Sequence, residues 1–209
     1  MTCVRFFSHG KNITLLFLIC MVFMNTSCLT SKGAEMEAGA DFLPGTAKGT
    51  RPVYITNSKK INLLLPEYAE RTVDLLQLLN GSFGEESFSL MVYSQIDSQG
   101  ISLSLFNDFG TDMGSVFFDG KQVVFDSAYF PKSLPGEYIL ADIQNAFYDE
   151  AALRANYSAS KLNFEAAAGL RRILDGKKII EEIEISESQI TIKNFLRKYE
   201  YQLIFEVLN

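Results

Sequence analysis

The chain has 209 residues, of which 47% are hydrophobic and 21% are charged, a composition typical of a globular protein with a full core. With 25 acidic and 19 basic residues the net charge is −6, which argues against nucleic acid as a partner, because phosphate binding needs a basic surface. The single histidine and all three cysteines lie within the first 28 residues. The rest of the chain therefore lacks the groups for a histidine-based triad, a cysteine nucleophile, a zinc site or haem ligation. We expect a protein that is not an enzyme and uses no metal or cofactor.

The N-terminal segment has the pattern of an export signal. Arg5 and Lys11 precede an apolar run at 13–24, and no acidic residue occurs before Glu35. This run is too short for a membrane span of about 20 residues, but it suits the apolar core of a signal peptide. We therefore predict that residues 1–27 are a signal peptide and that the protein is exported.

Residues 24–28 resemble the lipobox of bacterial lipoproteins, with small residues at the two positions before Cys28. The resemblance implies that Cys28 is acylated and becomes the new N-terminus, so that the membrane is a partner through the Cys28 acyl chains. The alternative is a soluble exported protein cleaved at or near Ser27. Leu29 after the cysteine implies, by the enterobacterial rule, a lipid anchor in the outer membrane that faces the periplasm.

The chain beyond the signal divides into a tether and one domain. Residues 28–51 are rich in small and polar residues without apolar periodicity, which is typical of a flexible tether. We predict a single domain at 52–209 that begins with the apolar stretch 53–65. The next stretch, 72–79, fits a helix or a strand, and Asn80-Gly81 favours a strand that leads into a turn.

Alternating apolar and polar residues then predict two hairpins, at 88–106 and 115–125, with turns at Gln99-Gly100 and Asp119-Gly120. One face of these strands is apolar and must be buried. The other face is also partly apolar, since we place on it Met91, Tyr93, Phe106 and Phe118. A sheet that is apolar on both faces needs a second cover or a ligand.

Residues 138–157 have apolar residues at three- and four-residue spacing, which predicts an amphipathic helix. Asp149 either interrupts this helix or caps a second short one. Five later stretches predict a meander of strands: 161–164, 169–174, 177–185, 189–195 and 200–208. We assign Glu181 with Glu182 and Glu184 to its solvated face. The fold class is α+β, with a curved antiparallel sheet, a half-open barrel, wrapped around one or two helices near residues 138–157.

The helix carries polar residues with two interpretations. The polar residues either contact a ligand at a cavity mouth or form the solvent-exposed side of the helix; they are Asp142, Gln144, Asn145 and Arg154. Asp142 with Asp149 suggests acid–base chemistry, but nothing in the sequence places them opposite each other, and we favour solvated acids. The aromatic residues of the hairpins and helix either line an acyl-chain pocket or pack the core. The candidate ligand-binding residues are Tyr93, Phe106, Phe118, Phe125, Asp142, Ile143 and Phe147.

Motifs along the second half of the chain resemble an uncharacterised family of bacterial envelope lipoproteins, sometimes encoded beside genes for aryl-polyene lipid synthesis. The matching residues, in order, are Leu140, Asp142, Ile143, Gln144, Ala151, Leu153, Arg154, Arg171, Arg172, Ile183, Ile192, Asn194, Tyr201 and Leu203. The resemblance covers about 66–208. This family is similar to the lipoprotein localisation factors LolA and LolB, whose curved sheet folds around helices to form a hydrophobic cavity. The resemblance thus implies a LolB-like domain that binds an acyl chain.

These observations lead to one principal functional hypothesis and two alternatives. The first is a lipid-anchored envelope protein that binds or chaperones a lipid or lipoprotein acyl chain in a hydrophobic cavity. The second is a non-enzymatic structural adaptor with a filled core that holds an envelope protein partner. The third is a carboxylate-dependent hydrolase that uses Asp142 and Asp149.

Overall fold

The computed structural model describes residues 49–127 and 135–205, and the predicted signal peptide, Cys28 and nearly all of the predicted tether lie outside the described residues. The large sheet consists of β3 (Val73–Phe83), β4 (Glu86–Asp97), β5 (Gly100–Phe106), β6 (Asp112–Phe118), β7 (Val123–Ser127), β8 (Asn163–Ala167), β9 (Leu170–Asp175), β10 (Lys178–Ile185), β11 (Gln189–Asn194) and β12 (Tyr199–Phe205). Its strands are antiparallel neighbours in the order β7-β6-β5-β4-β3-β12-β11-β10-β9-β8, so the sheet is open. The other elements are β1 (Gly49–Tyr54), β2 (Lys60–Leu64), a short 3-10 helix η1 (Pro66–Tyr68), α1 (Gly136–Phe147) and α2 (Glu150–Ala159).

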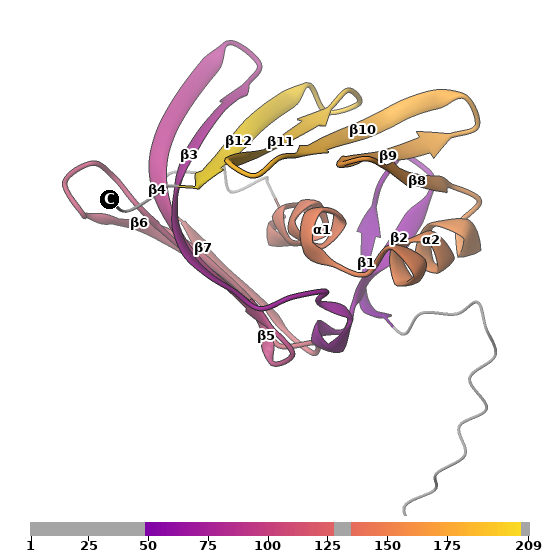
Figure 1. Ribbon diagram of the computed structural model, residues 1–209, viewed down its shortest axis with the longest axis horizontal. Helices are drawn as coiled ribbons and strands as arrows, with labels where there is room; N and C mark the ends of the chain where they lie inside the picture. The colour runs from indigo at the N-terminus through magenta and orange to yellow at the C-terminus, as the bar shows by residue number, and fades with distance from the viewer. Residues whose placement is uncertain (1–48, 128–134, 206–209) are drawn as a thin grey trace, which may run out of the picture. The chain divides into compact units, whose positions relative to one another are not determined.

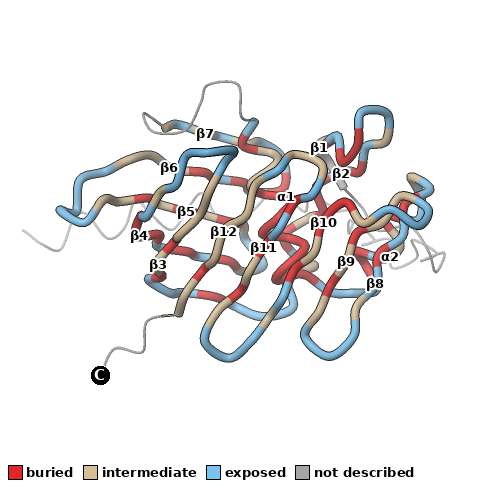
Figure 2. The backbone as a smooth tube through the Cα atoms, turned by 90° about the horizontal axis from the view of Figure 1, so that it is seen from above, coloured by how far each residue is buried: buried red, intermediate tan, exposed pale blue. Residues whose placement is uncertain are grey.

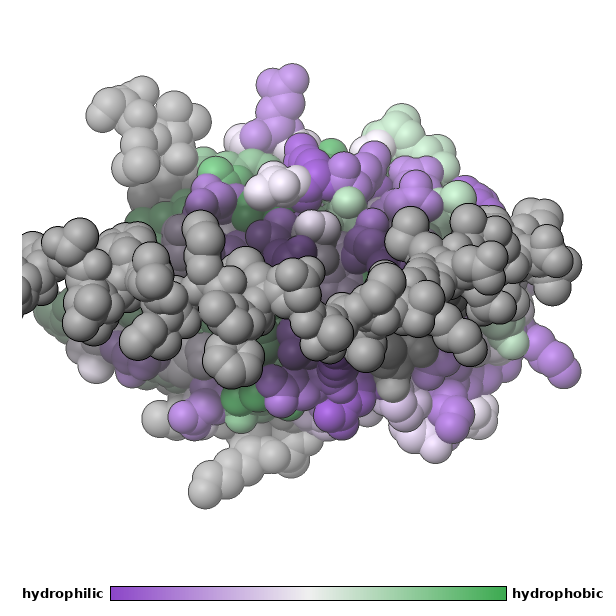
Figure 3. All heavy atoms as spheres, turned by 90° about the horizontal axis from the view of Figure 1, so that it is seen from below, coloured by the Kyte–Doolittle hydropathy of each residue, from purple (hydrophilic) through white to green (hydrophobic). Residues whose placement is uncertain are grey.

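The large sheet curves around α1, as Figure 1 shows. The β1–β2 hairpin and α2 lie on the side of α1 that the sheet leaves open, and α2 lies against β8 and β2. Buried residues alternate with exposed ones along the strands in Figure 2, because successive side chains point to opposite faces of a sheet. On the face drawn in Figure 3, hydrophilic residues predominate over smaller hydrophobic areas. The prediction of an α+β fold with a curved antiparallel sheet around helices is confirmed.

The helical region forms two helices. The side chain of Asp149 accepts a hydrogen bond of 2.8 Å from the backbone N–H of Ala152, which makes it the N-cap of α2. The alternative of a second capped helix is thereby confirmed. Residues 140–148 are all buried, so α1 has no wet side over this length. Neither helix of the described residues is long and apolar enough to cross a bilayer.

The predicted turn at Asn80-Gly81 is wrong, because both residues lie within β3, which continues to Phe83. A Cβ atom on Gly81 would come within 2.5 Å of the Phe88 ring and 2.7 Å of the Cβ of Tyr201. Glycine is therefore needed here for the close approach of two aromatic neighbours on one face of the sheet. The chain turns instead at Gly84, which has φ +64°.

The predicted position of Phe118 on the outer face is also wrong. Phe118 pairs with Ile101 and is fully buried on the concave face, whereas Phe117 takes the outer face with 38% of its surface exposed. The register of β5 and β6 decides this, because cross-strand partners share a face. The N-terminal boundary also differs from the prediction, since β1 begins at Gly49.

Two groups of interactions fix the C-terminal half of α1 against β2 and β9. The Gln144 side chain donates to the carbonyl oxygen of Leu64 and accepts from its N–H, both at 2.9 Å. It thus pairs both backbone groups of Leu64 as a neighbouring strand would. In the other group, Arg171 of β9 donates to three carbonyl oxygens at the end of α1, those of Asn145, Ala146 and Tyr148. Because helix ends carry unpaired carbonyls and partial negative charge, a cation from the sheet supplies the C-terminal cap of α1.

We predict that Arg171→Met lowers the free energy of unfolding by about 3 kcal/mol, because buried carbonyl groups lose a charged donor. Arg172→Met is the matched control. Its side chain is 39% exposed and pairs with Glu182 on the outer face, so we expect a loss of about 0–1 kcal/mol. Urea denaturation of both variants measures the difference. Equal losses would contradict the role assigned to Arg171.

Candidate functional site

A cavity of about 540 Å³ lies between α1 and the concave face of the large sheet. Its apolar sheet wall consists of Leu79, Val92, Leu103, Leu105, Val116 and Leu203. The opposite wall comes from α1, through Ile139 and Ile143. Ligand pockets in proteins commonly enclose about 300–1,000 Å³ and are lined mainly by apolar side chains, so this cavity has the size and lining of a binding site.

The cavity is elongated along β4. At one end its rim includes Phe83, which is 51% exposed, and the exposed residue Glu86. At the other end lies Ser94, which is 1% exposed. At roughly 3.3 Å per residue, the strand from Glu86 to Ser94 spans about 26 Å. The cavity lining therefore runs from an exposed rim at Glu86 to a buried end at Ser94.

A buried hydrogen-bond network forms one side of the cavity, and Asp142 is its centre. The Oδ2 atom of Asp142 accepts from the hydroxyls of Tyr199 at 2.7 Å and Tyr201 at 3.1 Å. Asp142 also shares a hydrogen bond with Glu181. Asp142, Tyr199 and Tyr201 all line the cavity, so this network presents polar groups to its interior.

Glu181 lies behind Asp142 and has its own partners. Its Oε1 accepts from Asn145 Nδ2 at 2.9 Å and its Oε2 accepts from Asn194 Nδ2 at 3.1 Å. The hydroxyl of Tyr157 donates in turn to Asn145 Oδ1 at 2.9 Å. Each oxygen of the Glu181 carboxylate is thus satisfied by an amide, as a buried anion requires.

The sequence analysis was wrong about the exposure of Asp142 and Glu181. We predicted Glu181 on a solvated face, but it is 4% exposed and lies on the concave face with Ile183. The signal was present, because Glu181 is two residues from Ile183 and so in phase with it in a strand. Asp142 is 5% exposed and faces Glu181 rather than Asp149, which caps α2.

Burial raises the pKa of Asp142 well above its ordinary value, and the neighbouring charge of Glu181 raises it further. The pKa of Glu181 is also raised by burial, while its hydrogen bonds with Asn145, Asp142 and Asn194 oppose that shift. Burial likewise raises the pKa values of Tyr199 and Tyr201, so both stay neutral donors. The carboxyl pair therefore keeps a shared proton to a higher pH than separate carboxyls would, and we place that proton on Asp142.

A guanidinium group lies beside this network. Arg197 follows β11, lines the cavity, and stacks over the Tyr138 ring with 4.1 Å between the guanidinium carbon and the ring centroid. It donates to the backbone carbonyls of Tyr54 and Ile55, the latter at 3.3 Å. Arg197 thus connects the β11–β12 turn to the β1–β2 hairpin at the cavity wall.

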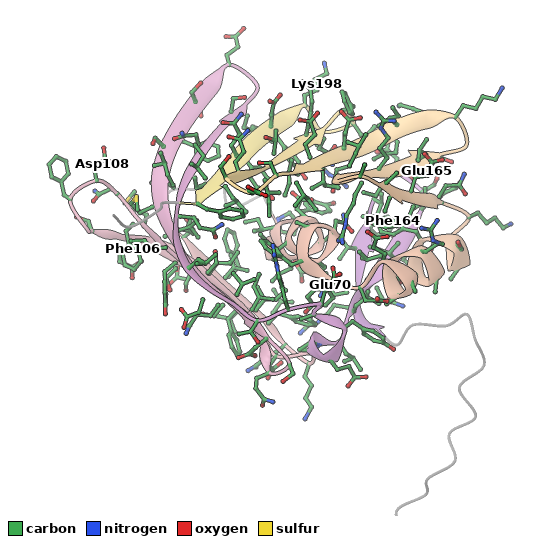
Figure 4. All side chains as sticks on the ribbon, in the orientation of Figure 1. Glu70, Phe106, Asp108, Phe164, Glu165 and Lys198 are labelled. Carbon is green, nitrogen blue, oxygen red and sulfur yellow. The ribbon has the colours of Figure 1, made fainter. Side chains whose placement is uncertain are left out.

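The structure brings two of the seven candidate ligand-binding residues, Asp142 and Ile143, to the cavity wall. Phe118 and Phe147 are fully packed in the core, and Phe125 is partly buried against it. Tyr93 lies on the outer face, where its hydroxyl donates to Asp74. Figure 4 shows Phe106 on the side of the sheet away from α1. Among the described residues, no cluster of acidic, histidine or cysteine side chains could hold a metal ion.

We predict that Asp142→Asn changes how stability depends on pH. Above the ordinary carboxyl pKa and below the raised pKa of Asp142, the folded state binds more protons than the unfolded state, so rising pH lowers the free energy of unfolding. Asparagine keeps a donor toward Glu181 and an acceptor for the tyrosines but does not titrate. Relative to the variant, the wild type should therefore lose stability as the pH rises above the ordinary carboxyl pKa of about 4 and up to the raised pKa of Asp142.

Urea denaturation at several pH values measures this difference. The exposed Asp126→Asn controls for the change in net charge. Wild-type and Asp142→Asn curves that run parallel over this pH range would contradict the buried shared proton.

Comparison with known proteins gives one family. The family described as a protein of unknown function (DUF3261) matches residues 74–209, which include both α-helices and nearly all of the large sheet. No curated protein matches the chain. The match confirms the expectation of an uncharacterised family. Since it spans more than half of the chain, this protein belongs to the DUF3261 family.

Proposed function

We propose that this protein is a lipid-anchored protein of the bacterial cell envelope that binds or chaperones an acyl chain in the cavity beneath its curved sheet. The observation that carries the proposal is the elongated cavity of about 540 Å³, with apolar walls and an open rim. Each buried methylene contributes about 0.8 kcal/mol, so an extended chain along β4 would bind favourably.

The size of the cavity favours one chain at a time. A cavity of about 540 Å³ lies within the range of about 300–1,000 Å³ that is typical of small-molecule pockets. We therefore propose that the cavity encloses one acyl chain.

The open volume of the cavity also bears on the alternatives. Side chains of α1 and of the large sheet line this volume but do not fill it. The cavity thus fits the first hypothesis better than the alternative of an adaptor with a filled core.

The export signal and the lipobox-like segment before Cys28 support the location at the envelope and the lipid anchor. The open, curved antiparallel sheet around a helix supports similarity to LolA and LolB. Cavity, anchor and fold together fit a carrier of acyl chains, which needs to stay at the membrane while it shields a chain from water.

Mass spectrometry tests binding on Cys28→Ser, which lacks the proposed anchor and is purified without detergent, and tests anchoring on the wild type. We expect a native spectrum with an added lipid mass that disappears on denaturation, because a chain in the cavity is bound noncovalently. An added mass that persists on denaturation and is absent from Cys28→Ser would be the anchor. A native mass without any releasable lipid, together with no uptake of a fluorescent fatty acid, would contradict acyl-chain binding.

We predict that Ser94→Trp abolishes fatty-acid binding, because the indole would fill the deep end of the cavity. Gln95→Trp is the matched control, since the next residue on β4 points to the opposite, exposed face. Fluorescence titration with a fatty acid should show loss of binding only for Ser94→Trp. Thermal denaturation checks that both variants are folded. Unchanged binding by a folded Ser94→Trp would place the chain elsewhere.

A further inference from the structure

Arg197 has donor groups that the protein does not use. A guanidinium has five N–H donors, and the contacts to the carbonyls of Tyr54 and Ile55 use two of them. Within the described part of the chain, no carboxylate forms an ion pair with Arg197, and its ring contact is with the face of Tyr138. Three donors remain on a group that lines the cavity.

We propose that Arg197 binds the anionic head group of a single-chain amphiphile whose chain lies in the cavity, an inference that rests on the proposed function. Arg197 is the only basic residue among the described residues that line the cavity. The planar arrangement of its remaining donors matches the two oxygens of a carboxylate or a phosphate. The Tyr138 ring beneath it and the two backbone carbonyls hold the guanidinium in place, which lowers the entropic cost of binding.

The position of Arg197 along the cavity suits a head group. It lies two residues before Tyr199, which pairs with Phe83 at the exposed rim. A head group at Arg197 would therefore stay close to water, while its chain extends along Val92 and Leu103 toward the buried end at Ser94. The ligand chemistry that fits is one charged end on one long apolar chain.

The acidic groups around Arg197 permit an anion there. Burial raises the pKa of the Asp142 carboxyl. In its protonated form this carboxyl carries no charge toward the cavity. Glu181 lies behind Asp142 and is held by two asparagine amides. Burial raises the pKa of Glu181, and the positive charge of Arg197 opposes that shift without an ion-pair contact between them, so the Arg197 donors stay available. Glu86 is exposed at the rim, where solvent and salt screen its charge.

The test compares three ligands that share one chain and differ in the head group: dodecanoate, dodecyl phosphate and dodecanol. Each displaces a neutral fluorescent apolar probe from the full chain carrying Cys28→Ser, which lacks the proposed anchor and is purified without detergent, at neutral pH. We expect at least one of the two anions to bind about tenfold or more tightly than dodecanol, because a charge-assisted hydrogen bond is added to the same chain burial. The stronger of the two anions distinguishes a carboxylate from a phosphate head group.

Variants of Arg197 assign the difference to this side chain. Arg197→Met should remove the preference for the anions over dodecanol, while Arg197→Lys should keep part of it, so the ratio of anion to dodecanol affinity within each variant is the quantity compared. Arg172→Met, on the outer face, controls for the loss of one positive charge.

The outcomes separate this inference from the proposed function. Equal affinities of the wild type for dodecanol and both anions would overturn the head-group site and leave acyl-chain binding intact. A folded Arg197→Met that still prefers the anions would also overturn it. If the probe and all three ligands fail to bind, the proposed function itself fails. The wild-type comparison does not depend on the folding of any variant.

Discussion

The structure depends on burying α1 on nearly all sides, although this helix carries polar side chains and ends in unpaired carbonyl groups. Buried polar groups destabilise a fold unless they find hydrogen-bond partners. Each surrounding layer supplies one: β2 pairs with Gln144, β10 provides Glu181 for Asn145, and β9 provides Arg171 for the helix end. These contacts determine how closely the helix approaches each part of the sheet. They differ between the β9–β12 part and the β3–β6 part.

That difference explains where the cavity lies. Toward β9–β12, polar contacts draw α1 against the sheet and fill the space with a hydrogen-bond network. Toward β3–β6, mainly apolar side chains line the cavity opposite Ile139 and Ile143, and the curvature of the sheet leaves a gap between them. Asp142 and Arg197 lie at the boundary of these two halves. The cavity is therefore apolar along its length and polar on one side, an arrangement suited to an amphiphile.

Several features were predictable because they depend on neighbours in the sequence. Alternation identified the two strands on either side of Gln99-Gly100, and Asp149 identified the start of α2. The errors arose where distant residues decide the outcome. Asn80-Gly81 has the composition of a turn, yet contact with Tyr201 makes glycine necessary within a strand. Glu181 was assigned to water because of its charge, although its phase in the strand pointed inward.

By itself the sequence determined the fold class, most strand and helix positions, and the absence of histidine and cysteine beyond residue 28, because composition and periodicity are local properties. Only the tertiary structure decided that Asp142 meets Glu181 and that Arg197 lies at a cavity wall. Of the seven residues proposed to bind a ligand, it placed Asp142 and Ile143 at that wall. The physical reason is that a cavity exists only between elements, and its lining depends on the register and curvature that bring distant strands and α1 together.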